Sequence, residues 1–207
     1  MKSDDVLKVI SVNHSNHSAL NNPLWKFSWQ FYAQPQVAEK CLALQDQHLV
    51  NVNLICWLIW STLLDKTCSP SDLQQCTQLI TQFDQQTIML RKIRIQLKTE
   101  ITQPITQHMS PQLPAHTTDN LAKRSVLRDI VKKLELLAEQ HQQRLLFEQT
   151  KTFNQTKATC DSNDISQHNL KQLLLFYQLP RPVLKTLREL LVAGQQVFDA
   201  NTHTINS

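Results

Sequence analysis

Hydrophobic residues recur at intervals of three or four along most of this chain, which is the spacing of one face of an α-helix. The longest such run follows Ser69-Pro70-Ser71-Asp72, where a hydroxyl, a first-turn proline and an acid indicate a helix start. A second long run follows a proline-rich stretch, so the pattern predicts long helices over residues 69–103 and 119–153. Their expected inward positions are Leu73, Cys76, Ile80, Phe83, Leu90, Leu97 and Ile101, then Leu127, Ile130, Leu134, Leu137, His141 and Leu145.

The stretch before the first long helix is rich in aromatic residues. Residues 24–60 hold all four tryptophans, which is too much apolar surface to leave in water, so the core is expected here. Breaks at Gln34-Pro35 and near His48 divide the stretch into three short helices. Asn51 is expected to cap the third, which is apolar nearly all round and should lie in the middle of the bundle. In the second helix the expected inward residues are Val37, Cys41, Leu42 and Leu44.

The chain contains a single glycine, Gly194, which excludes folds that depend on glycine turns. We therefore predict an all-α, single-domain helical bundle, with two long antiparallel helices beside a compact aromatic-rich cluster of short helices. The domain covers 22–200, with the aromatic cluster over 22–66, a proline-rich loop over 104–118 and C-terminal helices over 164–200. Residues 1–21 are expected to be a disordered tail, and residues 201–207 a second tail.

The charge, the cysteines and the apolar segments of the chain indicate in which cellular compartment the protein is expected. The net charge of +4 permits nucleic-acid binding without requiring it. The N-terminus carries acidic residues and lacks the apolar core of a secretory signal, and the most apolar run, Val50 to Leu64, is too short to span a membrane. The five cysteines form no CxxC pair, which favours reduced thiols. We expect a cytoplasmic protein that does not associate with membranes.

The aromatic stretch also carries a recognisable pattern, LWxFSxxFYAxPxVxxxCLxLQD, followed by VNL and Trp60. Together with the later segments LRKIRIQLK and ELLAEQHQQRLL, it resembles an uncharacterised family of small all-helical proteobacterial proteins, described only as a domain of unknown function. That family usually has glycine near Gln36 and near Leu49-Val50, and often tryptophan at Phe83, so this chain departs from it there. The resemblance covers Leu24 to Leu146 and implies a helical fold and a bacterial origin, but no activity.

Three polar residues, Gln45, Asp46 and Asn53, lie inside the aromatic stretch. They are candidates for the polar floor of a small-ligand pocket walled by tryptophan. Such residues more often cap helix ends and satisfy backbone groups, which is the interpretation that we favour.

Catalytic and metal-binding arrangements are not apparent. His141 falls on an inward stripe near Glu135 and Glu139, but the Glu-x-x-His spacing of two-metal bundles is absent. The two glutamates are expected to form solvated pairs with Lys132 or Arg128. No local signature joins a nucleophile to a base. We therefore predict no catalytic residue, no metal and no cofactor, and a chain that is not an enzyme.

Basic residues are concentrated on the two long helices, where an antiparallel arrangement would let them converge. Such a surface would attract phosphate backbones, although Glu100, Asp119 and Asp129 interrupt it and no exposed aromatic residue is interleaved. The candidate contact residues are Arg91, Lys92, Arg94, Lys98, Lys123, Arg124, Arg128, Lys132 and Lys133.

Long helices with imperfect seams and glutamine-rich outer faces often dock on another helix, their own copy included. The sequence therefore favours a non-enzymatic protein-interaction module of adaptor or regulatory type, with an unknown protein partner or self-association. An RNA- or DNA-associated protein that uses the basic faces is the first alternative. A small-ligand-binding protein or enzyme with a pocket in the aromatic cluster is the second.

Overall fold

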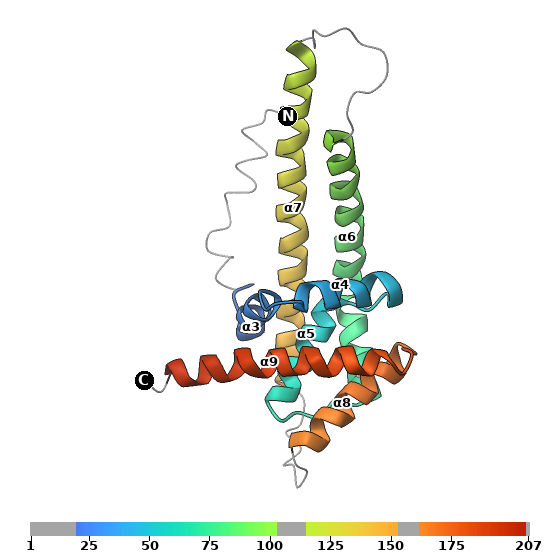
Figure 1. Ribbon diagram of the computed structural model, residues 1–207, viewed down its shortest axis with the longest axis vertical. Coiled ribbons are helices and arrows are strands. Elements are labelled where there is room, and N and C mark those ends of the chain that lie inside the picture. The colour runs from blue at the N-terminus through green and yellow to red at the C-terminus, as the bar shows by residue number, and fades with distance from the viewer. Residues whose placement is uncertain (1–19, 103–114, 153–161, 206–207) are drawn as a thin grey trace. The chain divides into compact units, whose positions relative to one another are not determined.

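The computed structural model describes residues 20–102, 115–152 and 162–205. In these ranges the chain is all-helical, as predicted, with no strand. The helices are α3 (Pro23–Tyr32), α4 (Val37–His48), α5 (Val52–Leu63), α6 (Pro70–Thr102), α7 (Ala115–Thr150), α8 (Ser162–Phe176) and α9 (Val183–Ile205) (Figure 1).

The contacts group the chain into two compact units, which we describe separately. The aromatic unit consists of the described residues within 1–80 and 142–207, and the two-helix unit of those within 81–141. Both boundaries fall inside the long helices α6 and α7. The sequence pattern contained no signal for them, because a continuous helix carries neither a loop nor a composition change at such a point.

The aromatic unit is built around α5. Every residue from Asn53 to Thr62 is buried, in agreement with the prediction of a central helix that is apolar nearly all round. Helices α3, α4, α8 and α9 all pack against α5 (Figure 1). Trp57 is completely buried, and its indole N–H donates a hydrogen bond to Thr150 Oγ1 at 2.8 Å, so this tryptophan has no unsatisfied donor in the core.

Helix starts follow the capping signals in the sequence. The Asn51 side chain accepts a hydrogen bond from the backbone N–H of Leu54 at 3.1 Å, which confirms it as the cap of α5. At the start of α6 the backbone N–H of Ser69 donates to Asp72, and the N–H of Asp72 donates back to the Ser69 hydroxyl. This reciprocal pair is a capping box, and it lies at the helix start that the sequence predicted.

Several turns use the left-handed backbone region without glycine. Gln36, Leu49, Asp65 and Gln178 have φ between 52° and 63°. Gln36 precedes α4 and Leu49 follows it, so the positions at which the resembling family usually has glycine are left-handed here. A side chain at such a φ carries a steric penalty that glycine lacks.

Some element boundaries differ from the predicted ones. Helix α7 begins at Ala115, so residues 115–118 are helical rather than loop, and α9 continues to Ile205, into the segment expected to be a tail. The fold begins before residue 22, since Leu20 is buried and the Asn22 side chain donates to its carbonyl. The rest of the expected N-terminal tail and most of the proline-rich loop lie outside the described residues.

Several side chains expected to face inward do not. Leu42 is exposed although it was assigned to an inward position, and Trp29 is 64% exposed although all four tryptophans were expected in the core. On α7 the largest correction concerns Leu127 and Leu134, which are 48% and 42% exposed. The buried positions there are Val131, Glu135, Ala138, Gln142, Gln143, Leu146 and Thr150. Polar residues can be buried on this face because each buried polar residue described below has a hydrogen-bonding partner. The spacing of hydrophobic residues does not reveal these partners.

Candidate functional site

Two arginines predicted as partner contacts are held inside the two-helix unit. Arg91 Nε donates to Glu135 Oε1 and its Nη2 to Glu139 Oε1, both at 3.1 Å. Arg94 binds Glu135 through two nitrogens, with Nη2 at 3.2 Å from Oε1. Glu135 and Glu139 therefore pair with the arginines of α6, not with Lys132 or Arg128 as expected. Arg91 and Arg94 are largely neutralised, and this removes them from the basic contact surface.

The two carboxylates have opposite pKa shifts. Burial alone would raise the pKa of Glu135, but hydrogen bonds from Arg94 and Arg91 outweigh it and bring the pKa below its ordinary value. For Glu139 burial dominates, so its pKa is raised although Arg91 acts in the other direction. The stabilisation from Glu135 is thus present at neutral pH and is lost as the pH falls through its lowered folded-state pKa.

The other basic candidates remain at the surface. Lys92, Lys98, Lys123, Arg124, Lys132 and Lys133 are exposed, whereas Arg128 is half-buried and lies 3.8 Å from Asp129. A helix turns about 100° per residue, so these cations point in several directions from the two helices. The nine predicted residues consequently do not form one continuous basic surface.

The three residues proposed for a ligand pocket do not converge. Gln45 Nε2 donates weakly to Asp46 Oδ1 at 3.5 Å on the exposed side of α4. Asn53 is buried, and its side chain pairs with two glutamines of α7. None of the three lines the groove described below.

Asn53 belongs to a buried amide cluster in the aromatic unit. Gln142 Oε1 accepts hydrogen bonds from Asn51 and Asn53 at 3.0 and 3.1 Å, and Gln143 Nε2 donates to Asn53 Oδ1 at 2.8 Å. A second buried amide, Asn169, accepts from the N–H of Cys68 and donates to Thr62 Oγ1. These contacts link segments distant in sequence, so the amides act as structural cross-links. Asn53 bonds to glutamine side chains, not to the backbone groups that the favoured interpretation assigned to it.

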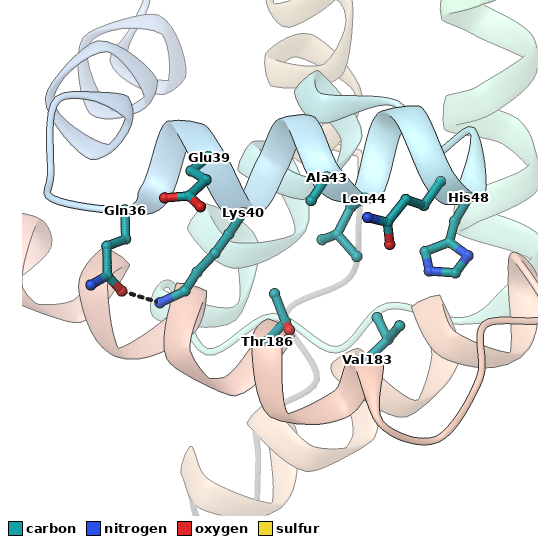
Figure 2. Close-up of a pocket in the computed structure, with 9 residues that line it drawn as sticks. Gln36, Glu39, Lys40, Ala43, Leu44, His48, Val183 and Thr186 are labelled. Carbon is teal, nitrogen blue, oxygen red and sulfur yellow. Dashed lines mark hydrogen bonds between the residues drawn. The ribbon is translucent and has the colours of Figure 1, made fainter.

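A groove of about 380 Å³ lies between α4 and α9 in the aromatic unit. Figure 2 shows Leu44 and Ala43 on one side and Val183 and Thr186 on the other. Lys40 at its edge already binds Gln36 and Glu189, each at 3.0 Å. The groove is open, and the polar residues Gln36, Glu39, Gln47 and His48 line it together with the apolar ones. Its lysine is bound internally, and the lining brings no nucleophile together with an oriented base.

The two-helix unit exposes apolar side chains in a regular pattern. On α7 Leu127, Ile130, Leu134 and Leu137 recur at intervals of three, four and three residues, so they share one face. Both Leu127 and Leu134 are exposed, and the other two are half-buried. On α6 Met89 and Ile93 are four residues apart and 65% and 40% exposed. This is the pattern of a helical seam without a covering partner in the structure.

The aromatic unit also contains four buried thiols, Cys41, Cys56, Cys68 and Cys76. Burial raises the pKa of the Cys76 thiol to about 12, with the Asp72 charge adding to the effect. Such thiols are protonated at neutral pH and are poor nucleophiles. The described side chains include no group of three or more His, Cys, Asp or Glu placed to share a metal ion. Within the same residues no helix has both the length and the apolar character to cross a bilayer.

Comparison with models of protein families gives a match over more than half of the chain. Residues 23–146, more than half of the chain, match the model of a family described as "Protein of unknown function (DUF2390)". The chain belongs to this family. The matched region contains all the residues on which the family resemblance was based, and in this chain it covers part of the aromatic unit and the whole two-helix unit. No curated protein and no solved structure matches this DUF2390 member significantly.

Sequence reasoning missed Glu135, Gln142, Asn169 and Thr150 as buried polar residues. One signal existed: Arg94 lies on the apolar stripe of α6, and a cation in that position requires an acidic partner. The contacts of Asn169 and Thr150 gave no such signal, since the partners of these residues lie about a hundred positions away in the sequence.

Proposed function

We propose that this DUF2390 protein is a non-enzymatic protein-interaction module that binds its partner through an apolar face of the two-helix unit. The apolar face consists of Met89, Ile93, Leu127, Ile130, Leu134 and Leu137. The observation that carries the proposal is the exposure of Leu127 and Leu134, 48% and 42%, on a stripe with regular seam spacing. Single exposed leucines are ordinary, but a contiguous apolar patch marks an interaction site.

For the apolar face to be continuous, its residues on α6 and its residues on α7 must lie on the same side of the two-helix unit. Phe83 stacks on His141 with ring centroids 5.2 Å apart, and Arg94 binds Glu135. Residue numbers therefore rise along α6 as they fall along α7, which supports an antiparallel pair (Figure 1). On an antiparallel pair of right-handed helices, Ile93 and Leu134 project from the same flank.

The opposite flank provides an internal comparison. Ile88 lies 140° from Ile93 around α6, and Leu136 lies 160° from Leu134 around α7, at about 100° per residue. Their exposures, 43% and 39%, nearly equal those of Ile93 and Leu134, 40% and 42%. Polar substitutions at Ile88 and Leu136 therefore control for a general loss of surface hydrophobicity when Ile93 and Leu134 are substituted.

We further propose that the protein is bacterial and acts in the cytoplasm. The buried, protonated thiols of Cys41, Cys68 and Cys76 support this location, because a reducing compartment leaves such residues as small core side chains. Nucleic-acid binding is the weaker alternative, since Arg91 and Arg94 are already bound to glutamates.

The test is a tagged pull-down from the source cells, run with nuclease and read by mass spectrometry. We expect a protein that binds the wild type, is lost with the double variant Ile93→Gln and Leu134→Gln, and is retained with Ile88→Gln and Leu136→Gln. All three proteins should unfold at similar temperatures, because the replaced side chains are exposed. A partner that tolerates the first double variant, or that disappears only with nuclease, would contradict the proposal.

A further inference from the structure

We infer that the outward side of α9 is a second interaction surface, which binds a short acidic segment of a protein partner. The surface is a basic row that consists of Arg181, in the turn before α9, and Lys185 and Arg188 on the helix itself. It belongs to the aromatic unit, so the inference does not rest on the apolar face of the two-helix unit. It is carried by the placement of the three cations and by the lack of described acidic partners for two of them.

The three cations lie on the side of α9 that faces away from the core. Lys185 and Arg188 are three residues apart, and Arg181 precedes Lys185 by about one turn. The helical path extends back to Arg181, because the N–H of Leu184 donates to the Arg181 carbonyl at 3.1 Å. All three basic side chains are exposed. The opposite side of α9 is buried through Val183, Leu187, Leu190 and Val197.

The charge of the basic row is not compensated by its neighbours. Neither Arg181 nor Arg188 forms a hydrogen bond or an ion pair with another described residue. Glu189 follows Arg188 in the sequence, but its carboxylate binds Lys40 of α4 at 3.0 Å. The hydrogen bond from Lys40 is the main reason why the pKa of Glu189 lies below its ordinary value, and Lys185 contributes less. The carboxylate nearest in sequence is therefore already neutralised.

The basic row also lies at the end of α9 where cations are least favourable. The N-terminal end of a helix carries partial positive charge, and acidic residues in the first turn normally compensate it. Helix α9 begins at Val183 and has no acidic residue in its first turn, which instead contains Lys185. Helix stability does not explain this arrangement, whereas attraction of an anionic partner does.

The backbone before α9 is restrained. Pro180 and Pro182 flank Arg181 and fix one dihedral angle on each side of it. The N–H groups of Val183, Leu184 and Lys185 donate to carbonyls of this turn, so an anion would meet the basic side chains, not the backbone. A restrained backbone loses little conformational freedom when a partner binds.

The row determines the chemistry of the partner. Carboxylates one helical turn apart would pair with Arg181, Lys185 and Arg188, and carboxylates bind guanidinium groups through two hydrogen bonds. Val192 continues the row by one turn and is 60% exposed. An apolar side chain next to the acidic residues of the partner would cover Val192. The row is about 10 Å long, which corresponds to two turns of a docked helix.

Two other anionic partners fit this surface less well. A nucleic-acid strand that continued along α9 would reach Asp199, which lies on the same side three turns after Arg188. Residues 181–192 also contain no aromatic side chain on which a base could stack. A lipid surface is bound through several inserted apolar side chains, and the exposed large ones between these residues are limited to Val192.

The experiment compares two alanine-based helical peptides of identical composition, each with three glutamates. In the row peptide the glutamates recur at intervals of four and three residues, and in the dispersed peptide they are distributed around the helix. Fluorescence anisotropy of each labelled peptide is measured against the full-length protein. We expect the row peptide to bind roughly tenfold more tightly, because only it can form all the charge pairs at once. The difference should shrink as salt is added.

Two double variants assign the binding to the basic row. Arg181→Glu with Arg188→Glu should weaken the row peptide at least about tenfold and should bind a matching peptide with lysines in place of glutamates. This gain of binding cannot come from an unfolded protein. The control, Lys26→Glu with Lys92→Glu, changes the net charge equally at exposed positions on α3 and α6 and should leave row-peptide binding unchanged.

Each other outcome would overturn the inference. Equal binding of the row and dispersed peptides would show attraction by overall charge only, and no binding of the row peptide would remove the surface. Loss of binding with Ile93→Gln and Leu134→Gln would place the peptide on the apolar face instead. Duplex DNA, or vesicles of phosphatidylcholine and phosphatidylserine, bound more tightly than the row peptide and released by Arg181→Glu with Arg188→Glu, would replace the acidic segment by a phosphate-bearing partner.

Discussion

At the residue scale, the buried polar side chains of this protein are explained by their partners. Glu135 is 7% exposed because two arginines meet it, and Gln142 is completely buried because two asparagines donate to it. Removal of one partner would leave a buried polar group unsatisfied, which is more destabilising than the bond is stabilising. Backbone strain is the other residue-scale feature, since four non-glycine residues in the described part of the chain adopt positive φ.

We expect Leu49→Gly to stabilise the protein. Leu49 ends α4 at φ 57°, and its side chain is 85% exposed, so it carries the left-handed penalty with little packing in return. Glycine removes the penalty but adds unfolded-state entropy, which leaves a net gain of about 0.5–1 kcal/mol. Urea unfolding should show a higher midpoint. The control is Leu42→Gly inside the same helix, which should lose about 1 kcal/mol. A loss at both positions would contradict the argument.

At the element scale, the close approach of α9 to α5 explains the position of the only glycine in the chain. A Cβ at Gly194 would lie 2.6 Å from Ile59 Cγ2 and 3.5 Å from Phe27 Cζ. Gly194 is buried within a helix, where glycine is otherwise unfavourable. Packing between helices therefore outweighs intrinsic helix propensity at this position.

We expect Gly194→Ala to destabilise the protein by about 1–3 kcal/mol, because the added methyl group overpacks the core. Helix propensity alone predicts the opposite sign, a gain of about 1 kcal/mol. The matched change in α9 is Val192→Ala, where the side chain is 60% exposed and the effect should be slight. Thermal unfolding of the two variants distinguishes the two effects, and a stabilised Gly194→Ala would show that α9 does not approach α5 this closely.

At the scale of the whole molecule, two compact units share two uninterrupted helices. Disruption of either unit therefore propagates along α6 and α7, and we propose that the domain over residues 22–200 folds cooperatively. The family match, over residues 23–146, includes residues of both units.

Cooperative unfolding can be measured with two optical signals. All four tryptophans lie in the aromatic unit, whereas helical circular dichroism reports both units. We expect the tryptophan fluorescence and the dichroism at 222 nm to give coincident transitions in urea, as for a two-state domain. A separate dichroism transition with unchanged fluorescence would show that the two-helix unit unfolds independently.

The sequence by itself determined the helices, the caps at Asn51 and Ser69, the central position of α5 and the family, because these depend on local spacing and composition. It also identified the α7 stripe from Leu127 to Leu137. Only the tertiary structure decided which side of α7 is buried. A helix with apolar residues on one face and polar residues on another can bury either face, provided that the polar residues find partners. Glu135 belongs to that second face, and its partners Arg91 and Arg94 lie on α6, more than forty positions away in the sequence. The same choice left the apolar stripe exposed, which turned a predicted core into the proposed contact surface.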